Sequence, residues 1–455
     1  MDEITRALQE LRRRRAGYQL YSNYYEGNHR LTFATEKFRN TFGNLFREFA
    51  DNLCPAVVDA VSDRLKLIGF DVEDGPAGAA DVAWELWQVN RMDERMGEIH
   101  TEALIAGDGY AIVWPDPRTG QPTIYPQDGT SMTVRYDPEV PGHILSAVKA
   151  WQTEDEFVRV TLYFPDRIEK WITRSACPAG WPESSQAFVP YEVPGEAWPL
   201  QHDYGRVPVF HFANNSRMGR SGKSELKDVV PLQDCLNKSL CDLMVAREFL
   251  ALPQRYATGL QFDIDPETGK PIPLFVPGAD RVWATQSKDV TFGQFEAADL
   301  GQFIQEQDSF RAEIARVSRT PLHYLLPQSG EFPSGEALKT AESPFLAKVM
   351  KRQTAFGNVW EDLIGFALQM VGQSGVRLSA LWEDPAPRSE KDQGEVLLIK
   401  KQIGVDDETL LGELGYAPEQ IRVMLAKKQA TAAEAQRTML RTFDRGGSDP
   451  DEEVA

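Results

Sequence analysis

Apolar and polar positions divide the first half of the chain into a helical part and a strand-rich part. Helical patterns cover residues 2–25, 36–65 and 81–107. From residue 109 to 212 the apolar and β-branched stretches are short and are separated by Pro, Gly and Asp, which is typical of antiparallel strands. Within that region, residues 175–206 are rich in Pro, Gly and Ser, and we expect a long, loosely ordered excursion. The pattern predicts an α+β fold with strands on a helical base.

The second half begins with two long helices around a short insert. One helix is expected from Ser224 to Gln254, where Pro231 either bends it or marks its true start. The other is expected from Ala298 to Thr320 and is stopped by Pro321. The residues between them carry strand-like stretches and turn signals, so a helix–insert–helix arm is predicted.

A loop punctuated by Gly and Pro follows the arm and leads into another helix. The loop has the sequence LLPQSGEFPSG (325–335), and the helix is expected from Ser334, a plausible N-cap, to about Val371. Pro344 cannot donate to the carbonyl of Thr340, so the helix should kink there. The predicted buried stripe consists of Leu346, Val349, Met350, Phe356, Trp360, Leu363, Ile364 and Ala367.

The C-terminal part is predicted to be a strand and three short helices. The strand covers residues 376–382 and the helices lie within 389–441. Gly404 and Gly415 sit where helix C-terminal caps are expected, and Pro418 is suited to open the last helix. The tail GGSDPDEEVA should be disordered.

Composition and charge narrow the function classes. The 455 residues are 42% hydrophobic and 26% charged, the balance of a folded soluble protein, and no run of 18 apolar residues predicts a membrane helix. The charged N-terminus lacks the apolar core of a secretory signal. The net charge of −19 argues against a protein that grips nucleic acid through a basic surface, although it is compatible with a conduit. The basic run Arg12–Arg15 is therefore read as a solvated or inter-subunit face.

Candidate chemistry is sparse. Four scattered cysteines fit reduced thiols in an intracellular product, and the histidines show no metal-binding spacing. No catalytic set, cofactor site or metal site is predicted. The segment GRSGKSE (219–225) resembles a phosphate-binding loop only in part, because the first glycine of that motif would fall on Arg217. A glycine-bearing turn into the following helix is the preferred interpretation.

Several segments, spread over about residues 20–440, resemble portal proteins of long-tailed bacteriophages (siphoviruses), especially those of actinobacterial hosts. SGEALKTAE after a long helix looks like the tunnel loop and kinked tunnel helix of that family. The other similar segments occur in the family's order and are YYEGNHRL (24–31), NLCPAVVDAVSDRLKLIGF (52–70), EALIAGDGYAIVW (102–114), VPVFHFANNSRMGRSGKSELKDVVPLQDCLNKSLCDLM (207–244) and LWEDPAPRSEKDQGE (381–395).

The resemblance implies an α+β portal-type subunit that assembles into a ring, as a dodecamer. The implied regions are a mixed wing (1–223), a stem helix (224–254), a small β-containing clip (255–296), a second stem helix (297–326), a tunnel loop (327–335), the kinked tunnel helix with the second part of the wing (336–388), and a helical crown with a disordered acidic tail (389–455). The implied channel residues are Gln328, Ser329, Gly330, Glu331, Phe332, Pro333 and Ser334 in the loop, and Gly335, Glu336, Lys339 and Pro344 in the tunnel helix.

The resemblance also implies a function and partners. The ring would lie at one capsid vertex of the virion, after assembly in the host cytoplasm, and pass double-stranded DNA during packaging and ejection. Its implied protein partners are the major capsid and scaffolding proteins, the terminase large subunit and the head-completion adaptor, with no membrane, no cofactor and no enzymatic activity. Two alternatives stay open: a terminase-like ATPase motor using Lys223, and a shell or scaffolding protein without a channel.

Overall fold

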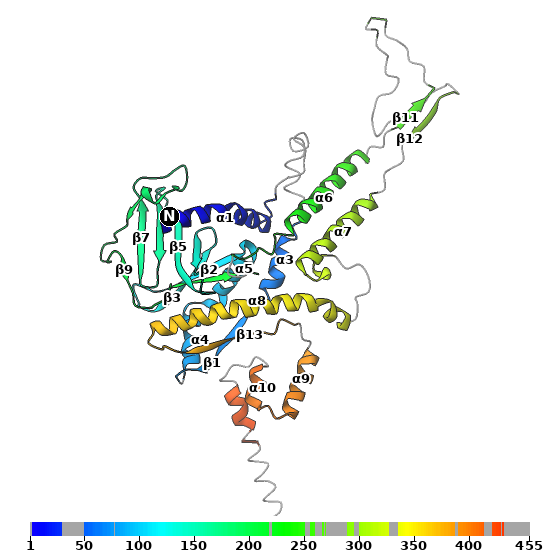
Figure 1. Cartoon of the computed structure of the whole chain (residues 1–455). Coiled ribbons are helices and arrows are strands. Elements are labelled where there is room, and N and C mark those ends of the chain that lie inside the picture. Colours follow the sequence, from blue (N-terminus) through cyan, green and yellow to red (C-terminus); the bar gives the residue numbers. More distant parts are fainter. Residues whose placement is uncertain are drawn as a thin grey trace, which may run out of the picture. The chain divides into compact units, whose positions relative to one another are not determined.

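A computed structural model gives the fold as two compact units, Met1–Pro385 and Ala386–Ala455 (Figure 1). The structure describes residues 2–29, 50–76, 78–217, 221–250, 255–259, 266–267, 269, 289–294, 300–326, 335–386, 390–413, 421–428 and 430–431. Among these residues, no helix is long and apolar enough to cross a membrane.

The first helix of the first unit begins as the sequence predicts. Helix α1 (Glu3–Tyr25) starts at Asp2, whose carboxylate accepts a hydrogen bond from the Thr5 amide at 2.9 Å and so caps the helix. The helix predicted over 36–65 is shorter in its described part, because residues 50–53 are not helical and α3 covers Cys54–Ser62. Pro55 lies in the first turn of α3, where a missing N–H costs nothing, and so marks its start.

The last helix predicted for the base is in fact two helices. They are α4 (Ala79–Val89) and α5 (Met92–Ala106), and Arg91 between them has a left-handed backbone with φ of 53°. The Asn90 side chain at the break accepts a hydrogen bond from the Ile124 amide at 2.9 Å. A distant strand thus fixes the break, which apolar periodicity alone could not reveal.

The strand-rich region forms two antiparallel sheets, which confirms its prediction. One sheet has the order β10-β2-β3 and the other the order β4-β5-β6-β7-β8, with β9 also paired to β7. The strands are β2 (Asp108–Pro115), β3 (Pro122–Asp128), β4 (Met132–Tyr136), β5 (Ile144–Gln152), β6 (Val158–Tyr163), β7 (Arg167–Thr173), β8 (Phe188–Pro190), β9 (Leu200–Gln201) and β10 (Val209–Ala213).

The prediction that residues 175–206 are a loosely ordered excursion is wrong. This stretch contains the 3-10 turn η1 (Ser185–Ala187) and the strands β8 and β9, both of which pair with β7. Phe188 is buried in a core beneath the sheet, and the Trp198 indole donates to the Lys170 carbonyl at 2.8 Å. A few aromatic anchors order a segment whose average composition suggested otherwise.

Two helices that pack against each other follow the sheets (Figure 1). They are α6 (Val230–Leu250) and α7 (Gly301–Ser318). Pro231 lies in the first turn of α6, so it marks the true start of that helix rather than a bend. In the insert, β11 (Arg255–Thr258) pairs antiparallel with β12 (Thr291–Gln294), which confirms its strand content.

Helix α8 (Gly335–Met370) packs against β13 (Arg377–Trp382), which pairs with β1 (Leu67–Asp74). Pro344 lies inside α8 as expected. One member of the predicted buried stripe is wrong, since Met350 is 49% exposed. The stripe members that are buried are Val349, Phe356, Trp360, Leu363, Ile364 and Ala367, with Leu346 partly buried.

The second unit is helical where the structure describes it. It contains α9 (Glu390–Gln402), α10 (Asp407–Glu413) and a helical stretch at 421–428. Gly404 has a φ of 98°, the left-handed conformation that glycine adopts readily, so its predicted capping role is confirmed. Gly415, Pro418 and the acidic tail lie outside the described residues.

Candidate functional site

The predicted channel loop lies outside the described residues, whereas both of its flanks lie within them. The residues outside are Gln328, Ser329, Gly330, Glu331, Phe332, Pro333 and Ser334. Gly335 and Glu336 form the first turn of α8, followed by Lys339 with an exposed side chain and Pro344. The structure therefore defines how the ends of the loop are held.

The flank before the loop is attached to α8 through one buried carboxylate. The 3-10 turn η2 (Leu322–Tyr324) brings His323 Nε2 to 3.2 Å from Glu342 Oε1, and the Tyr324 hydroxyl donates to the same oxygen at 3.3 Å. An Arg64 nitrogen lies 3.6 Å from the other Glu342 oxygen. Two segments, η2 and Arg64 in the turn after α3, thus converge on Glu342 of α8.

A second buried charge cluster fixes α8 to the base of the two long helices. Glu225, in the turn before α6, pairs with Lys348 at 2.8 Å and with Arg352 at 2.7 Å, and all three side chains are buried. The Lys348 ammonium also donates to the carbonyl of Ser318, at the end of α7, at 2.8 Å. One lysine of α8 therefore contacts residues next to both long helices.

The electrostatics of this cluster favour the charged carboxylate. Burial alone would raise the pKa of Glu225, but the nearby Lys348 and Arg352 outweigh it and lower the pKa to about 2. Two cations share one anion here, so loss of Glu225 would leave like charges together in a buried site.

Sequence reasoning missed Glu342, Lys348 and Arg352 as anchors. A signal was present in the spacing of these residues. Glu342 stands four residues before the partly buried Leu346, and Arg352 stands three residues after the buried Val349, so both lie on the core-facing side of α8. A charged residue in phase with an apolar stripe indicates a buried ion pair, although it does not identify the partner.

The segment around Gly222 and Lys223, which partly resembles a phosphate-binding loop, forms a structural turn. The Gly222 amide donates to Asp108 Oδ1 at 2.7 Å, and any side chain at Gly222 would overlap the backbone of Gly107. Lys223 pairs with Asp228. Gly222 is thus required for close backbone contact, and the lysine ammonium faces a carboxylate rather than an open loop.

Asp108 is the centre of a buried hydrogen-bonded group. Its carboxylate lies 2.7 Å from His211 Nε2 and accepts from the Tyr18 hydroxyl at 2.5 Å. Burial opposes ionisation of Asp108, but the contacts with His211 and Tyr18 prevail and lower its pKa to about 2. The Tyr136 hydroxyl lies 2.8 Å from the other ring nitrogen of His211. The group ties α1, β2, β4 and β10 together.

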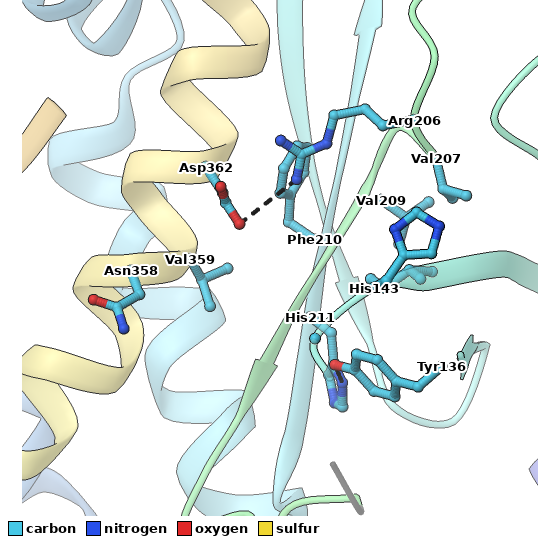
Figure 2. A pocket seen from close by; sticks show the side chains of 12 residues that line it. Tyr136, His143, Arg206, Val207, Val209, Phe210, His211, Asn358, Val359 and Asp362 are labelled. Carbon is cyan, nitrogen blue, oxygen red and sulfur yellow. Dashed lines mark hydrogen bonds and ion pairs between the residues drawn. The ribbon is translucent and has the colours of Figure 1, made fainter. Parts of the chain in front are cut away.

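A cavity of about 300 Å³ lies between this group and α8 (Figure 2). Figure 2 shows Tyr136 beside His211 at one end and Arg206 facing Asp362 of α8 at the other. The Arg206 guanidinium lies 3.6 Å from the Asp362 carboxylate. The Arg206 guanidinium also lies over the Phe210 ring, 4.9 Å from its centre. These polar groups are largely engaged with one another, and the contact with Asp362 gives α8 a further attachment to the sheet.

The basic run Arg12–Arg15 faces its own chain. Each guanidinium contacts an acidic or aromatic side chain of the same molecule: Arg12 with Glu183, Arg13 and Arg14 with Glu10, and Arg15 with Trp181. Arg12, Arg13 and Arg15 remain exposed, as expected of a solvated face whose charges are partly paired within the chain. Within the part of the chain that the structure describes, no three His, Cys, Asp or Glu side chains gather as metal ligands.

Known proteins resemble this chain over most of its length. The sequence profile of the family described as "Phage portal protein, SPP1 Gp6-like" matches residues 5–432. The portal proteins of Mycobacterium phage D29 and Mycobacterium phage L5 are each 27% identical over 348 residues, covering 72% of this chain and 68% of the relative. Among solved structures, a chain of the virion of a native gene transfer agent particle aligns with a TM-score of 0.48 and 12% identity, covering 84% of this chain and 92% of that chain.

Proposed function

Because the chain belongs to the phage portal protein family of the SPP1 Gp6-like type, we propose that residues 327–335 line the narrowest part of a ring-shaped DNA channel. In this proposal identical subunits form a dodecamer at one capsid vertex, with major capsid and scaffolding proteins around it. DNA enters during packaging and leaves during ejection.

The observation that carries the proposal is the way both flanks of the loop are fixed. Glu342 holds the turn at His323 and Tyr324, and the far flank is the first turn of α8 itself. Lys348 and Arg352 fix α8 to the buried Glu225. A loop with both ends held on a rigid helix can face a moving polymer without being displaced.

The loop's composition suits passage of DNA. Gln328, Ser329, Glu331 and Ser334 offer neutral or negative groups, and residues 327–335 contain no Lys or Arg. Phosphate affinity in protein–DNA contacts comes mainly from Lys and Arg, so this loop would hold the backbone weakly. DNA could then slide along it in either direction.

The remaining roles are assigned by region. The insert 255–296, which contains the β11–β12 pair, is proposed as the clip that docks the terminase large subunit and later the head-completion adaptor. The subunit itself is proposed to be structural and without ATPase activity. The turn geometry at Gly222 and Lys223 supports this, because the part of the motif that resembles a phosphate loop is used for packing.

The test is to make the loop basic. A Ser329→Lys/Glu331→Lys variant is expected to assemble into rings, seen by electron microscopy, but to package DNA more slowly or stall, because the lysines would bind phosphates. A Ser329→Gln/Glu331→Gln variant controls for side-chain size. Packaging at the wild-type rate by rings with both lysines would show that this loop does not contact DNA.

A further inference from the structure

In the described part of the C-terminal unit, more large apolar side chains are exposed than are buried. Among its described residues, the large apolar side chains that are buried are Leu410, at 7% exposure, and Ile421, at 6%. Leu398, Ile399, Ile403, Val423 and Met424 are all exposed. So small a helical unit gains little stability from such a core, and an exposed apolar patch of this kind marks an interaction surface.

Part of this surface is concave. A cleft of about 410 Å³ opens between α9, α10 and the helical stretch at 421–428. Its walls are mainly leucine and methionine side chains, and Lys401 and Lys428 stand at its rim. Both lysines pair with the single carboxylate of Asp407, so the rim keeps a net positive charge. The apolar lining consists of Leu397, Leu398, Leu410, Leu411, Met424 and Leu425.

Another part of the surface is a ridge on the opposite face of α9. Ile399 lies on α9 and Ile403 in the turn directly after it, where the Ile403 amide still donates to the Ile399 carbonyl at 3.1 Å. The two side chains are 58% and 75% exposed. At about 100° per residue they project away from the side of α9 that carries Leu397 and Lys401 into the cleft. Glu395 lies one turn before Ile399 on the ridge side, so the ridge carries an acid where the cleft rim is basic.

We infer that the ridge of one copy packs into the cleft of the neighbouring copy in the ring. The inference rests on the proposed ring, because a cyclic assembly joins two different faces of each subunit. This unit carries both faces, one convex and one concave, with complementary charge. A second copy of the chain is therefore the occupant that the surface fits.

The test is a cross-link between copies. In rings carrying Ile403→Cys with Leu411→Cys, mild oxidation is expected to join neighbouring chains into a ladder on a non-reducing gel. The chain already holds free cysteines at positions 54, 177, 235 and 241, so wild-type protein and each single variant give the background. Intact rings without a ladder above that background would overturn the interface, and residues 432–455 would become the alternative occupant of the cleft.

A second measurement uses ring stability. Ile403→Asp is expected to raise the protein concentration at which rings dissociate by about tenfold or more, since burial of an isoleucine is worth at least that factor. Ala426→Asp, at an exposed site outside both ridge and cleft, is the control. Equal dissociation of the two variants would also refute the interface. Wild-type protein that forms no rings would instead refute the proposed function and this interface together.

Discussion

His100 is a residue whose charge state matters to the whole first unit. Its ring is fully buried and stacks on Phe356 with centres 5.0 Å apart, and its Nε2 accepts from the Trp360 indole at 2.9 Å. Burial lowers the pKa of His100 to about 3. The folded protein therefore requires neutral His100, whereas the unfolded chain binds a proton near pH 6.5.

This difference predicts an acid sensitivity that begins well above the carboxylate range. The contribution of His100 to stability should be complete above about pH 6.5 and decrease as the pH falls toward 3, by at most roughly 1.4 kcal/mol per pH unit. The pKa values of His29 and His202 are also lowered and that of Glu102 is raised, so these groups contribute to the pH dependence as well. The pH dependence of the wild type is therefore compared with that of His100→Gln, which lacks only the His100 contribution. Urea unfolding between pH 7.5 and 5 should show a shallower pH slope in the variant; identical slopes would contradict the prediction.

Substitutions of different members of the Glu225 cluster are expected to reduce stability by different amounts. Glu225→Gln leaves two buried cations without an anion and should destabilise by about 3–5 kcal/mol. Lys348→Met leaves a neutral Glu225–Arg352 pair and loses mainly hydrogen bonds, so about 1–2 kcal/mol is expected. Equilibrium unfolding of both variants gives the comparison. A greater loss in Lys348→Met than in Glu225→Gln would show that the shared carboxylate is not the centre of the cluster.

We expect substitution of Lys223 to have little effect on stability and none on ATP hydrolysis. Its ammonium forms a surface pair with Asp228, so Lys223→Ala should change stability by no more than about 0.5 kcal/mol. Phosphate release from ATP should be at background for both wild-type and variant protein. ATP hydrolysis by the wild type that disappears in the variant would favour the packaging-motor alternative.

At the scale of elements, α8 shows which features could be predicted from the sequence and which could not. Its extent, its internal proline and most of its apolar stripe follow from a period of three to four residues. Met350 was wrongly placed in the stripe, and the burial of Lys348 was missed because its partner, Glu225, lies in a different part of the chain. The break at Asn90 was missed for the same reason, since it depends on a hydrogen bond from a distant strand.

The anchoring of the loop by α8 predicts a local change rather than a global one. Glu342→Gln should weaken the contacts of His323 and Tyr324 and speed hydrogen exchange of the backbone amides in η2 by about tenfold. Met350→Gln, at an exposed site of the same helix, is the control. Exchange measured by mass spectrometry on peptides covering 320–326 should respond in the first variant alone, and no response in either would argue against the anchor.

At the scale of the whole molecule, the strongly negative charge does not depend on the acidic tail. Deleting residues 446–455 removes Asp449, Asp451, Glu452 and Glu453 and no base, so the net charge changes from −19 to −15. A segment with so little apolar surface is not expected to form an interface. The truncated protein should form rings of unchanged subunit number by light scattering, and a monomeric product would identify the tail as an assembly element.

The family and the α+β class could be predicted from the sequence because their signals extend along the chain. The path of residues 327–334 could not be predicted from the sequence, because Gly and Pro permit many turns.

Because both ends of the loop are fixed, its length and the stability of the subunit can vary nearly independently. For a flexible loop with tethered ends, doubling the length adds only about 0.6 kcal/mol of closure entropy. Insertions between Leu326 and Gly335 are therefore expected to change the free energy of folding little. If residues 327–335 line the channel as proposed, each added residue would narrow it, and the diameter of the channel would be nearly independent of the stability of the subunit.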